Sequence, residues 1–257
     1  MRNGKVPIIA VMVVLFLFGL AVFLYPYIHK AVVDISLRND AQEFIDRVTF
    51  ELWEEQLPEE QEIVQDSAEQ PHQELLEVMQ AYNERIFLEE QDGLCDPWSY
   101  QQPSFTLKDY GLEDEVFGVI SIPKLDIEMP LYLGATYQHL ADGAAHLSQT
   151  SLPIGGNNTN CVIAGHRGWK GATYFRYITE LELGDQVIIT NLWDSMTYEV
   201  KETQIIQPND IEKILIQNDR ELITLLTCHP YASGGRQRYL VICERIHHEP
   251  DTEINHQ

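Results

Sequence analysis

The N-terminal part of the chain is dominated by one long apolar stretch. From Val6 to Tyr27 no residue is charged, in the run VPIIAVMVVLFLFGLAVFLYPY. About 20 apolar residues are enough for a helix to cross a bilayer. The stretch ends in Leu24-Tyr25-Pro26-Tyr27, and such aromatic residues are typical of a membrane–water interface rather than of a signal-peptide cleavage site. We therefore expect an uncleaved signal anchor, with a cleaved signal peptide as the alternative.

The charges around this stretch predict its direction. Arg2 and Lys5 precede it, and Lys30 alone follows before Asp34. Basic residues favour the cytoplasmic side of a membrane span. We expect a cytoplasmic N-terminus, a single span and an extracytoplasmic remainder, since no second long apolar run follows.

Residues 31–92 are predicted to be an acidic helical region. Pro58 and Pro71 interrupt it, and a second helix is predicted from Gln73 to Phe87. The acidic residues are interpreted as a solvated helix face, with an acidic docking surface as the alternative. Apolar residues recur at roughly helical spacing before the first proline, at Val32, Ile35, Leu37, Phe44, Ile45, Val48 and Leu52.

From about Val116 the pattern changes to short β-type runs separated by Gly, Asn, Asp and Pro. Helical pieces are predicted near Gln138–Ala141 and Ala172–Ile178. So many short strands over one region are typical of a closed or nearly closed β-barrel. The runs are VFGVISIP, IEMPLYL, NCVIAG, QVIITNL, MTYEVKETQII, LITLLT and RYLVICER.

Composition narrows the class of partner. The 257 residues are 44% hydrophobic, enough for a globular core, and 17 basic against 40 acidic residues give a formal charge of -23. Nucleic acid is excluded as a partner, because binding of phosphates needs clusters of Lys and Arg. Four cysteines occur without a CxxC pair or a His/Cys cluster, so no metal site is predicted. Cys161 and Cys243 lie inside strand-like runs and are interpreted as small buried hydrophobic residues.

Three polar residues lie at the ends of predicted strands. Cys228 follows the run Leu222–Thr227, His166 follows the run NCVIAG, and Arg238 begins the run RYLVICER. If the last two strands form an antiparallel hairpin, Arg238 lies across from Cys228. Arg236 is the alternative cation.

These three residue types form a coherent catalytic set. A thiol needs a neighbouring base or cation to ionise near neutral pH. An imidazole can take that proton and later give it to a departing amine. A guanidinium can stabilise the oxyanion of a tetrahedral intermediate.

The sequences around the three residues resemble those of the sortases. Together they occur in the order of that family, and the resemblance covers about Val116 to Ile246. The similar segments are Thr224-Leu225-Leu226-Thr227-Cys228, like the TLxTC signature with its Thr224, Leu225 and Thr227; Ala164-Gly165-His166-Arg167-Gly168; and Arg238-Tyr239-Leu240-Val241.

The resemblance implies a mainly β fold, an eight-stranded barrel with short helices, preceded here by N-terminal helices and one transmembrane helix. It implies a cysteine transpeptidase that cuts an LPxTG-like sorting signal through a thioacyl intermediate, with His166, Cys228 and Arg238 as catalytic residues. Neither a cofactor nor a metal is expected. The expected place is a Gram-positive type cell surface, anchored in the cell membrane.

A further segment suggests the subclass. Asp96-Pro97-Trp98 resembles the lid of class C sortases, which polymerise pilins, and Cys228-His229-Pro230-Tyr231 is similar to the class C pattern. The loop before Arg238 is one residue longer than usual, and the C-terminal membrane helix of many class C members is absent. The expected partners are pilin or surface proteins with C-terminal sorting signals and a pilin lysine as the amine acceptor.

Other functions stay open from sequence alone. They are a cell-wall-anchoring sortase with a peptidoglycan amine as acceptor, a hydrolytic cysteine peptidase and a non-catalytic membrane scaffold. The expected division of the chain is 1–30 (cytoplasmic N-terminus and anchor), 31–92 (acidic helical region), 93–110 (lid loop and linker), 111–247 (catalytic barrel) and 248–257 (polar tail).

Overall fold

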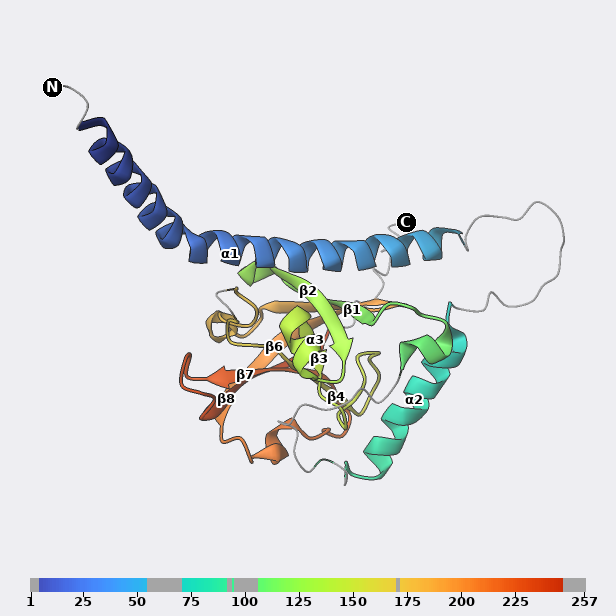
Figure 1. Ribbon diagram of the computed structural model, residues 1–257. Coiled ribbons are helices and arrows are strands. Elements are labelled where there is room, and N and C mark those ends of the chain that lie inside the picture. The colour runs from blue at the N-terminus through green and yellow to red at the C-terminus, as the bar shows by residue number, and fades with distance from the viewer. Residues whose placement is uncertain (1–4, 55–70, 92–93, 95–105, 170–171, 247–257) are drawn as a thin grey trace, which may run out of the picture.

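The structure, a computed structural model, describes residues 5–54, 71–91, 94, 106–169 and 172–246. Eight strands within these residues form a closed barrel in the order β1-β2-β3-β4-β7-β8-β6-β5 (Figure 1), which confirms the predicted fold class. The strands are β1 (Val116–Ile122), β2 (Ile127–Leu133), β3 (Ala144–His146), β4 (Thr159–Ala164), β5 (Gln186–Thr190), β6 (Ser195–Ile206), β7 (Glu221–His229) and β8 (Gln237–Arg245).

The pairing of three strands determines which strand ends meet at one edge of the barrel. β4 pairs in parallel with β7, and β7 pairs antiparallel with β8. Parallel strands finish at the same edge of a sheet. The ends of β4 and β7 and the start of β8 therefore share one rim of the barrel.

These three strands read as continuous apolar runs because both of their faces are covered. One face fills the barrel interior, and the other lies under the segment that contains the short 3-10 helix η4 (Ile211–Ile214). Interior side chains include Cys161, Ile163, Ile223, Leu225, Val241 and Cys243; outer ones include Val162, Leu226 and Leu240, which share a cluster with Leu94 and Ile214.

The prediction that Cys161 and Cys243 are buried hydrophobic residues is confirmed. Both thiols are free and lie in the barrel interior, on the two strands that flank Ile223. Burial raises the pKa of each thiol well above its ordinary value. Neither group is therefore a ready nucleophile.

Two local elements differ from expectation. The three-residue strand β3 was not predicted, because Ala-Ala-His has no β-type pattern of its own. The helix predicted at Ala172–Ile178 is wrong: Ala172 makes a β-bridge with Trp169, and a turn leads to the 3-10 helix η3 (Ile178–Glu180). Tyr174, at φ +40°, lies outside helical geometry.

The other short helix is present as predicted. Helix α3 (Tyr137–Asp142) begins after Thr136, whose hydroxyl oxygen accepts a hydrogen bond of 3.1 Å from the amide of His139. Such an N-cap satisfies one of the free donors in the first turn. The remaining 3-10 turns are η1 (Leu107–Tyr110) and η2 (Pro123–Leu125).

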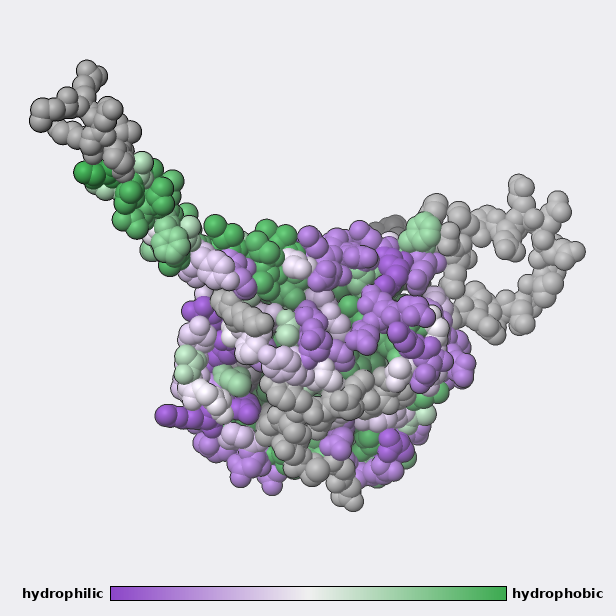
Figure 2. Space-filling model, in the orientation of Figure 1, coloured by the Kyte–Doolittle hydropathy of each residue, from purple (hydrophilic) through white to green (hydrophobic). Residues whose placement is uncertain are grey.

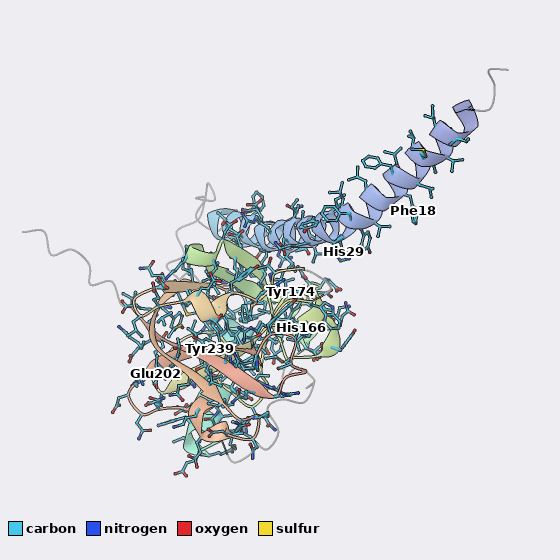
Figure 3. All side chains as sticks on the ribbon, turned by 90° about the vertical axis from the view of Figure 1, so that its left-hand side faces the viewer. Phe18, His29, His166, Tyr174, Glu202 and Tyr239 are labelled. Atoms are coloured by element: carbon cyan, nitrogen blue, oxygen red, sulfur yellow. The ribbon has the colours of Figure 1, made fainter. Side chains whose placement is uncertain are left out.

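Helix α1 (Lys5–Glu54) is one long bent helix with Pro26 inside it. Its first part, which includes Phe18, projects from the barrel and is apolar and exposed, and its second part lies along β2 and β1 (Figures 1, 2 and 3). A proline removes a backbone donor and is a common cause of such a kink. Within the described chain α1 alone is long and apolar enough to cross a membrane. The side chains that α1 buries against the barrel are Leu37, Ala41, Phe44 and Val48.

Helix α2 (Gln73–Leu88) confirms the second predicted helix and packs into the same cluster as α1. Leu75 and Met79 are completely buried there. Asn83 is also buried, and its side-chain oxygen accepts a 2.7 Å hydrogen bond from the amide of Leu152. The Asn83 side chain thus satisfies the backbone amide of Leu152, which lies outside the strands.

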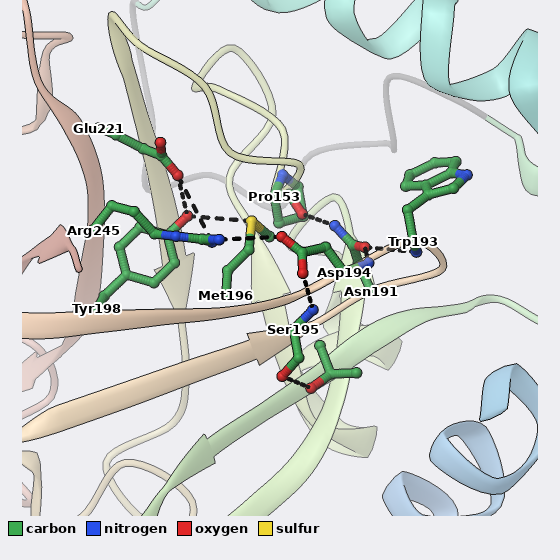
Figure 4. Close-up of polar contacts among 10 residues, drawn as sticks. Pro153, Asn191, Trp193, Asp194, Ser195, Met196, Tyr198, Glu221 and Arg245 are labelled. Carbon is green, nitrogen blue, oxygen red and sulfur yellow. Dashed lines mark hydrogen bonds and ion pairs between the residues drawn. The ribbon is translucent and has the colours of Figure 1, made fainter. Parts of the chain in front are cut away.

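A polar network closes the barrel end opposite to Cys228 (Figure 4). The Tyr198 hydroxyl donates to Glu221 over 3.1 Å, and Arg245 contacts Asp194 at 3.1 Å. The Arg245 guanidinium also lies over the Tyr198 ring, 5.6 Å from its centroid. These groups partner one another, so this end is tied together rather than open for chemistry.

We expect the buried His146 to make stability depend on pH. Its Nε2 lies 3.2 Å from the Thr150 carbonyl oxygen, and burial lowers its pKa from 6.5 to about 4. The unfolded chain binds the proton first, so this contribution to the free energy of unfolding is complete above pH 6.5 and is lost as pH falls towards 4. The loss is roughly 3 kcal/mol.

Denaturant titrations of the full chain in detergent, repeated across this pH range, measure the effect. His146→Gln should reduce the pH dependence, whereas the partly buried control His72→Gln should keep it. An unchanged pH dependence in His146→Gln would show that other groups cause it.

Candidate active site

Three adjacent strand ends bring the predicted residues together at one rim. Ala164 of β4 pairs with Leu226 of β7, so His166 and Cys228 each lie two residues beyond this pair. On the other side of β7, Cys228 is the register partner of Arg238 in β8. The predicted hairpin register is confirmed, and the cysteine lies between the other two residues.

A buried hydroxyl ties the His166 segment to β7. The Thr227 hydroxyl donates to the Gly165 carbonyl over 2.7 Å, and the Gly165 amide donates to the Leu226 carbonyl over 3.0 Å. Together these bonds extend the parallel pairing to the residue before the histidine. Thr227 of the signature therefore positions the segment that carries His166.

Steric crowding explains why the residue before His166 is a glycine. A Cβ on Gly165 would lie 2.5 Å from a ring carbon of Phe175, which no ordinary contact allows. Phe175 is completely buried, and its amide donates to the His166 carbonyl over 2.9 Å. The loop after β4 therefore folds back under the histidine only because residue 165 has no side chain.

The other signature residues are structural. The Thr224 hydroxyl donates to the Asn160 side-chain oxygen over 2.9 Å, and the Asn160 amide donates to the Ile214 carbonyl over 3.0 Å. Leu225 points into the barrel interior and is fully buried. These residues hold β4, β7 and the covering segment together, so that β7 presents Cys228 at its end.

Cys228 is exposed, and a glycine of the following loop leaves room around it. A Cβ on Gly235 would lie 3.3 Å from the Cys228 sulfur and 3.2 Å from Nη1 of Arg238. The thiol and the guanidinium thus border the same small space. Gly235 also adopts φ +75°, which disfavours residues with a side chain.

The Arg238 guanidinium is held by backbone oxygens. Nη1 donates to the Gly235 carbonyl over 2.6 Å and to the Gln237 carbonyl over 3.1 Å. Arg236, the alternative cation, is exposed and lies in the loop before β8 begins. The geometry therefore favours Arg238 as the residue beside the thiol.

His166 lies in an aromatic setting on the same side of the barrel as Tyr174 (Figure 3). Its ring stacks on Trp169, with centroids 4.5 Å apart, and meets the edge of Tyr174 at 6.1 Å. Burial lowers its pKa, because the apolar rings disfavour the charged form. Its Nε2 is buried and has no hydrogen-bond partner among the described residues, so this nitrogen is not engaged by the structural contacts that hold the ring.

Arg167 is a contact residue that the sequence prediction did not assign a role. Its Nη1 lies 3.3 Å from the Cys228 carbonyl oxygen and 2.6 Å from Nδ1 of His229. The pKa of His229 is lowered by burial and by the charge of Arg167, so Nδ1 accepts this bond in the neutral ring. Arg167 thereby ties the His166 loop to the end of β7. Only its position next to His166 could have suggested it.

The arrangement suits acyl transfer. A neutral imidazole and a fixed guanidinium flank an exposed thiol, which matches the needs of a base, an oxyanion donor and a nucleophile. Among the described residues, no group of three or more His, Cys, Asp or Glu could hold a metal ion. The predicted lid, Asp96, Pro97 and Trp98, lies outside the described residues, as does most of the linker 93–110.

Comparison with known sequences identifies relatives. The sortase domain family matches residues 120–246. Sortase D of Bacillus subtilis (strain 168) is 32% identical over 131 residues, which are 50% of this chain and 63% of that protein. Sortase A of Listeria monocytogenes is 29% identical over 144 residues, 54% of this chain and 63% of that protein. The chain thus spans less than two thirds of the length of these curated relatives.

Solved structures give broader coverage. A sortase C structure of Streptococcus pneumoniae has a TM-score of 0.66 at 30% identity, covering 81% of this chain and 97% of that one. The pilus-related sortase C of Group B Streptococcus has a TM-score of 0.60 at 31% identity, covering 67% of this chain and 88% of that one. The similarity to these structures therefore extends beyond the residues that form the barrel.

We expect Trp169 to be the main cause of the lowered pKa of His166. In Trp169→Ala, water reaches the imidazole, the charged form is better solvated, and the pKa should rise towards its ordinary value of about 6.5. Trp169→Phe keeps a stacked ring and should keep the pKa low. An NMR titration of the His166 ring, in a Cys228→Ala background that removes coupling to the thiol, measures both variants. Equal pKa values in wild type and Trp169→Ala would contradict this account.

Proposed function

We propose, from the premise that this chain belongs to the sortase family of cysteine transpeptidases, that it cleaves a sorting signal with Cys228 as its nucleophile. The observation that carries the proposal is the pairing of Cys228 with Arg238 on one neighbouring strand and its alignment with His166 on the other. Neither Cys161 nor Cys243 is accessible to a substrate.

The proposed mechanism has two acyl-transfer steps, and His166 moves a proton in each of them. The Cys228 thiolate attacks the carbonyl between Thr and Gly of an LPxTG-like signal, and the Arg238 guanidinium donates to the oxyanion. His166 takes the thiol proton and gives it to the departing glycine amine; because burial lowers the pKa of His166, its imidazolium is a stronger acid than that of an ordinary histidine. An acceptor amine then attacks the thioester carbonyl and loses a proton to His166, which passes this proton to the departing sulfur, so that Cys228 leaves as a thiol and His166 is neutral again.

We propose a lysine amine of a pilin as the acceptor, which makes the reaction pilus polymerisation. Support comes from the structural relatives, several of which are sortases C and one of which is described as pilus-related. Cell-wall anchoring, with a peptidoglycan amine as acceptor, is the alternative, and the curated relatives reported above are named sortase A and sortase D rather than sortase C. A hydrolytic peptidase or a non-catalytic scaffold has no observation in its favour.

The proposed location is the cell membrane, with α1 as a single anchor and the barrel outside the cytoplasm. The apolar and exposed first part of α1 supports the anchor. The orientation rests on the basic residues Arg2 and Lys5 before the span and on the acidic remainder after it.

A ligation experiment tests this function and the role of Arg238. Full chain in detergent is incubated with pilin-type substrates, and covalent ladders are read on a denaturing gel. Arg238→Lys should slow ladder formation roughly 100-fold, because an ammonium does not reproduce the planar fork of donors that meets an oxyanion. Arg236→Lys is the matched control and should ligate within about two-fold of wild type, since it lies outside the site.

Cys228→Ala should give no ladder and no cleaved signal. If Arg236→Lys is the damaging change, the cation is assigned wrongly. If wild type links the signal to peptidoglycan-type amines but never to a pilin, the cell-wall-anchoring alternative holds.

We also propose that Asp96, Pro97 and Trp98 form a lid over Cys228. An Asp–Arg pair and an aromatic ring could close the groove, and the apparent affinity for substrate would fall with the closed fraction. The double variant Asp96→Ala, Trp98→Ala should then be alkylated faster at Cys228 by a small thiol reagent and should cleave short peptides faster. Modification rates are compared with wild type, with the other three cysteines replaced in both. Equal rates would mean that residues 96–98 do not guard the thiol.

A further inference from the structure

After Pro26, helix α1 has two opposite faces. The face towards the barrel is buried through Leu37, Ala41, Phe44 and Val48. The face away from the barrel begins apolar, at positions separated by four and then three residues, which lie on one side of a helix. Its members Ile28, Val32 and Ile35 remain 58%, 60% and 58% exposed, and Val32, at the edge of this face, also borders the groove between α1 and Trp169.

The outward face changes character further along. Asn39, Gln42 and Asp46 continue the same helical side and are exposed, and the Gln42 side chain donates to Asp46 over 2.8 Å. At 1.5 Å per residue, the apolar part ends about 13 Å beyond Pro26. A stripe that is apolar near the bend and polar further on is what a helix needs if it leaves an apolar medium at a slant.

We propose that the segment Ile28–Ile35 lies in the interfacial layer of the bilayer that the preceding part of α1 spans. The proposal rests on the membrane anchoring proposed above. The outward stripe is continuous, on the same helix, with the exposed apolar side chains from Ile8 onwards (Figure 2). Tyr25 and Tyr27, at the bend, are residues that favour the membrane–water boundary. Lipid is therefore the occupant that the chain itself brings to this face.

The docked segment also holds the back of the active-site loop. Asp34, within it, accepts hydrogen bonds from the Thr173 amide over 2.9 Å and the Thr173 hydroxyl over 2.8 Å. Thr173 lies two residues before Phe175, whose ring contacts Gly165. Figure 3 shows His29 of α1 next to the side of the barrel that carries Tyr174 and His166.

Docking of this segment also affects the loop that follows His166. A groove of about 610 Å³ lies between α1 and the loop residues Trp169 and Tyr174, whose rings contact the His166 ring. Bilayer contact would thus orient the active site as well as retain the enzyme.

Spin labels on the full chain in phosphatidylcholine vesicles test the proposal. Single cysteines are introduced at Val32 or Ile35, at Asn39 as the matched position on the same outward face, and at Phe16 within the span. Cys95 and Cys228 are replaced, while the buried Cys161 and Cys243 stay. Collision with oxygen, which dissolves in lipid, is compared with collision with a water-soluble nickel chelate. An interfacial depth of about 5–10 Å should raise the oxygen-to-nickel ratio at 32 and 35 at least about three-fold over 39.

Each result is decisive. If Phe16 lies in lipid but positions 32 and 35 match 39, the docking proposal is wrong and the anchor stands. If 32 and 35 are shielded from both reagents, protein covers this face and the lipid proposal is equally wrong. If Phe16 is itself exposed to water, the anchor fails together with the docking. The ligation ladder of the unlabelled chain tests the transpeptidase function separately.

Discussion

The parallel pairing of β4 with β7 is the constraint on which the active site depends. It places the carboxyl ends of both strands at one rim, so that His166 and Cys228 continue side by side. Because β7 then turns back into β8, Arg238 returns to the same level from the other side. A barrel with these two strands in any other order would contain the same three residues without bringing them together.

Small buried contacts hold this pairing to the last residue. The Thr227 hydroxyl continues the ladder to Gly165, and Arg167 links the loop after His166 to the end of β7. A buried donor or acceptor that lacks its partner costs free energy. These hydrogen bonds therefore make the strand pairing specific as well as stable. Two glycines make room for this arrangement because they have no side chain. Gly165 accommodates the Phe175 ring, and Gly235 leaves the space that the thiol and the guanidinium share.

Electrostatics at the rim follow from this packing. Aromatic rings around His166 lower its pKa, whereas the Arg238 charge is oriented by backbone carbonyls and stays beside the exposed thiol. The thiols of Cys161 and Cys243, with burial and no cation, have raised pKa values. Position relative to the rim, rather than residue type, therefore separates the proposed nucleophile from two inert cysteines.

The sequence by itself determined those features that a single segment encodes. The apolar span, the helix at Gln73–Leu88, seven of the eight described strands and the register of Cys228 with Arg238 could be predicted, because each reflects local periodicity or a short hairpin. The many short strands predicted a barrel, and the motif resemblance predicted its eight strands and the roles of the three site residues, although not what Thr224 or Thr227 contacts.

Tertiary structure decided the remainder, because it depends on neighbours far away in sequence. β3 is a strand only since β2 and β4 supply its partners, and the segment at Ala172–Ile178 is not helical because its backbone bonds to His166 and Trp169. The role of Arg167 and the exposure of Val32 and Ile35 likewise follow from what the barrel covers and what it leaves open. Local patterns indicate that a side chain will be buried or reactive. Only closure of the barrel determines which other residues that side chain contacts.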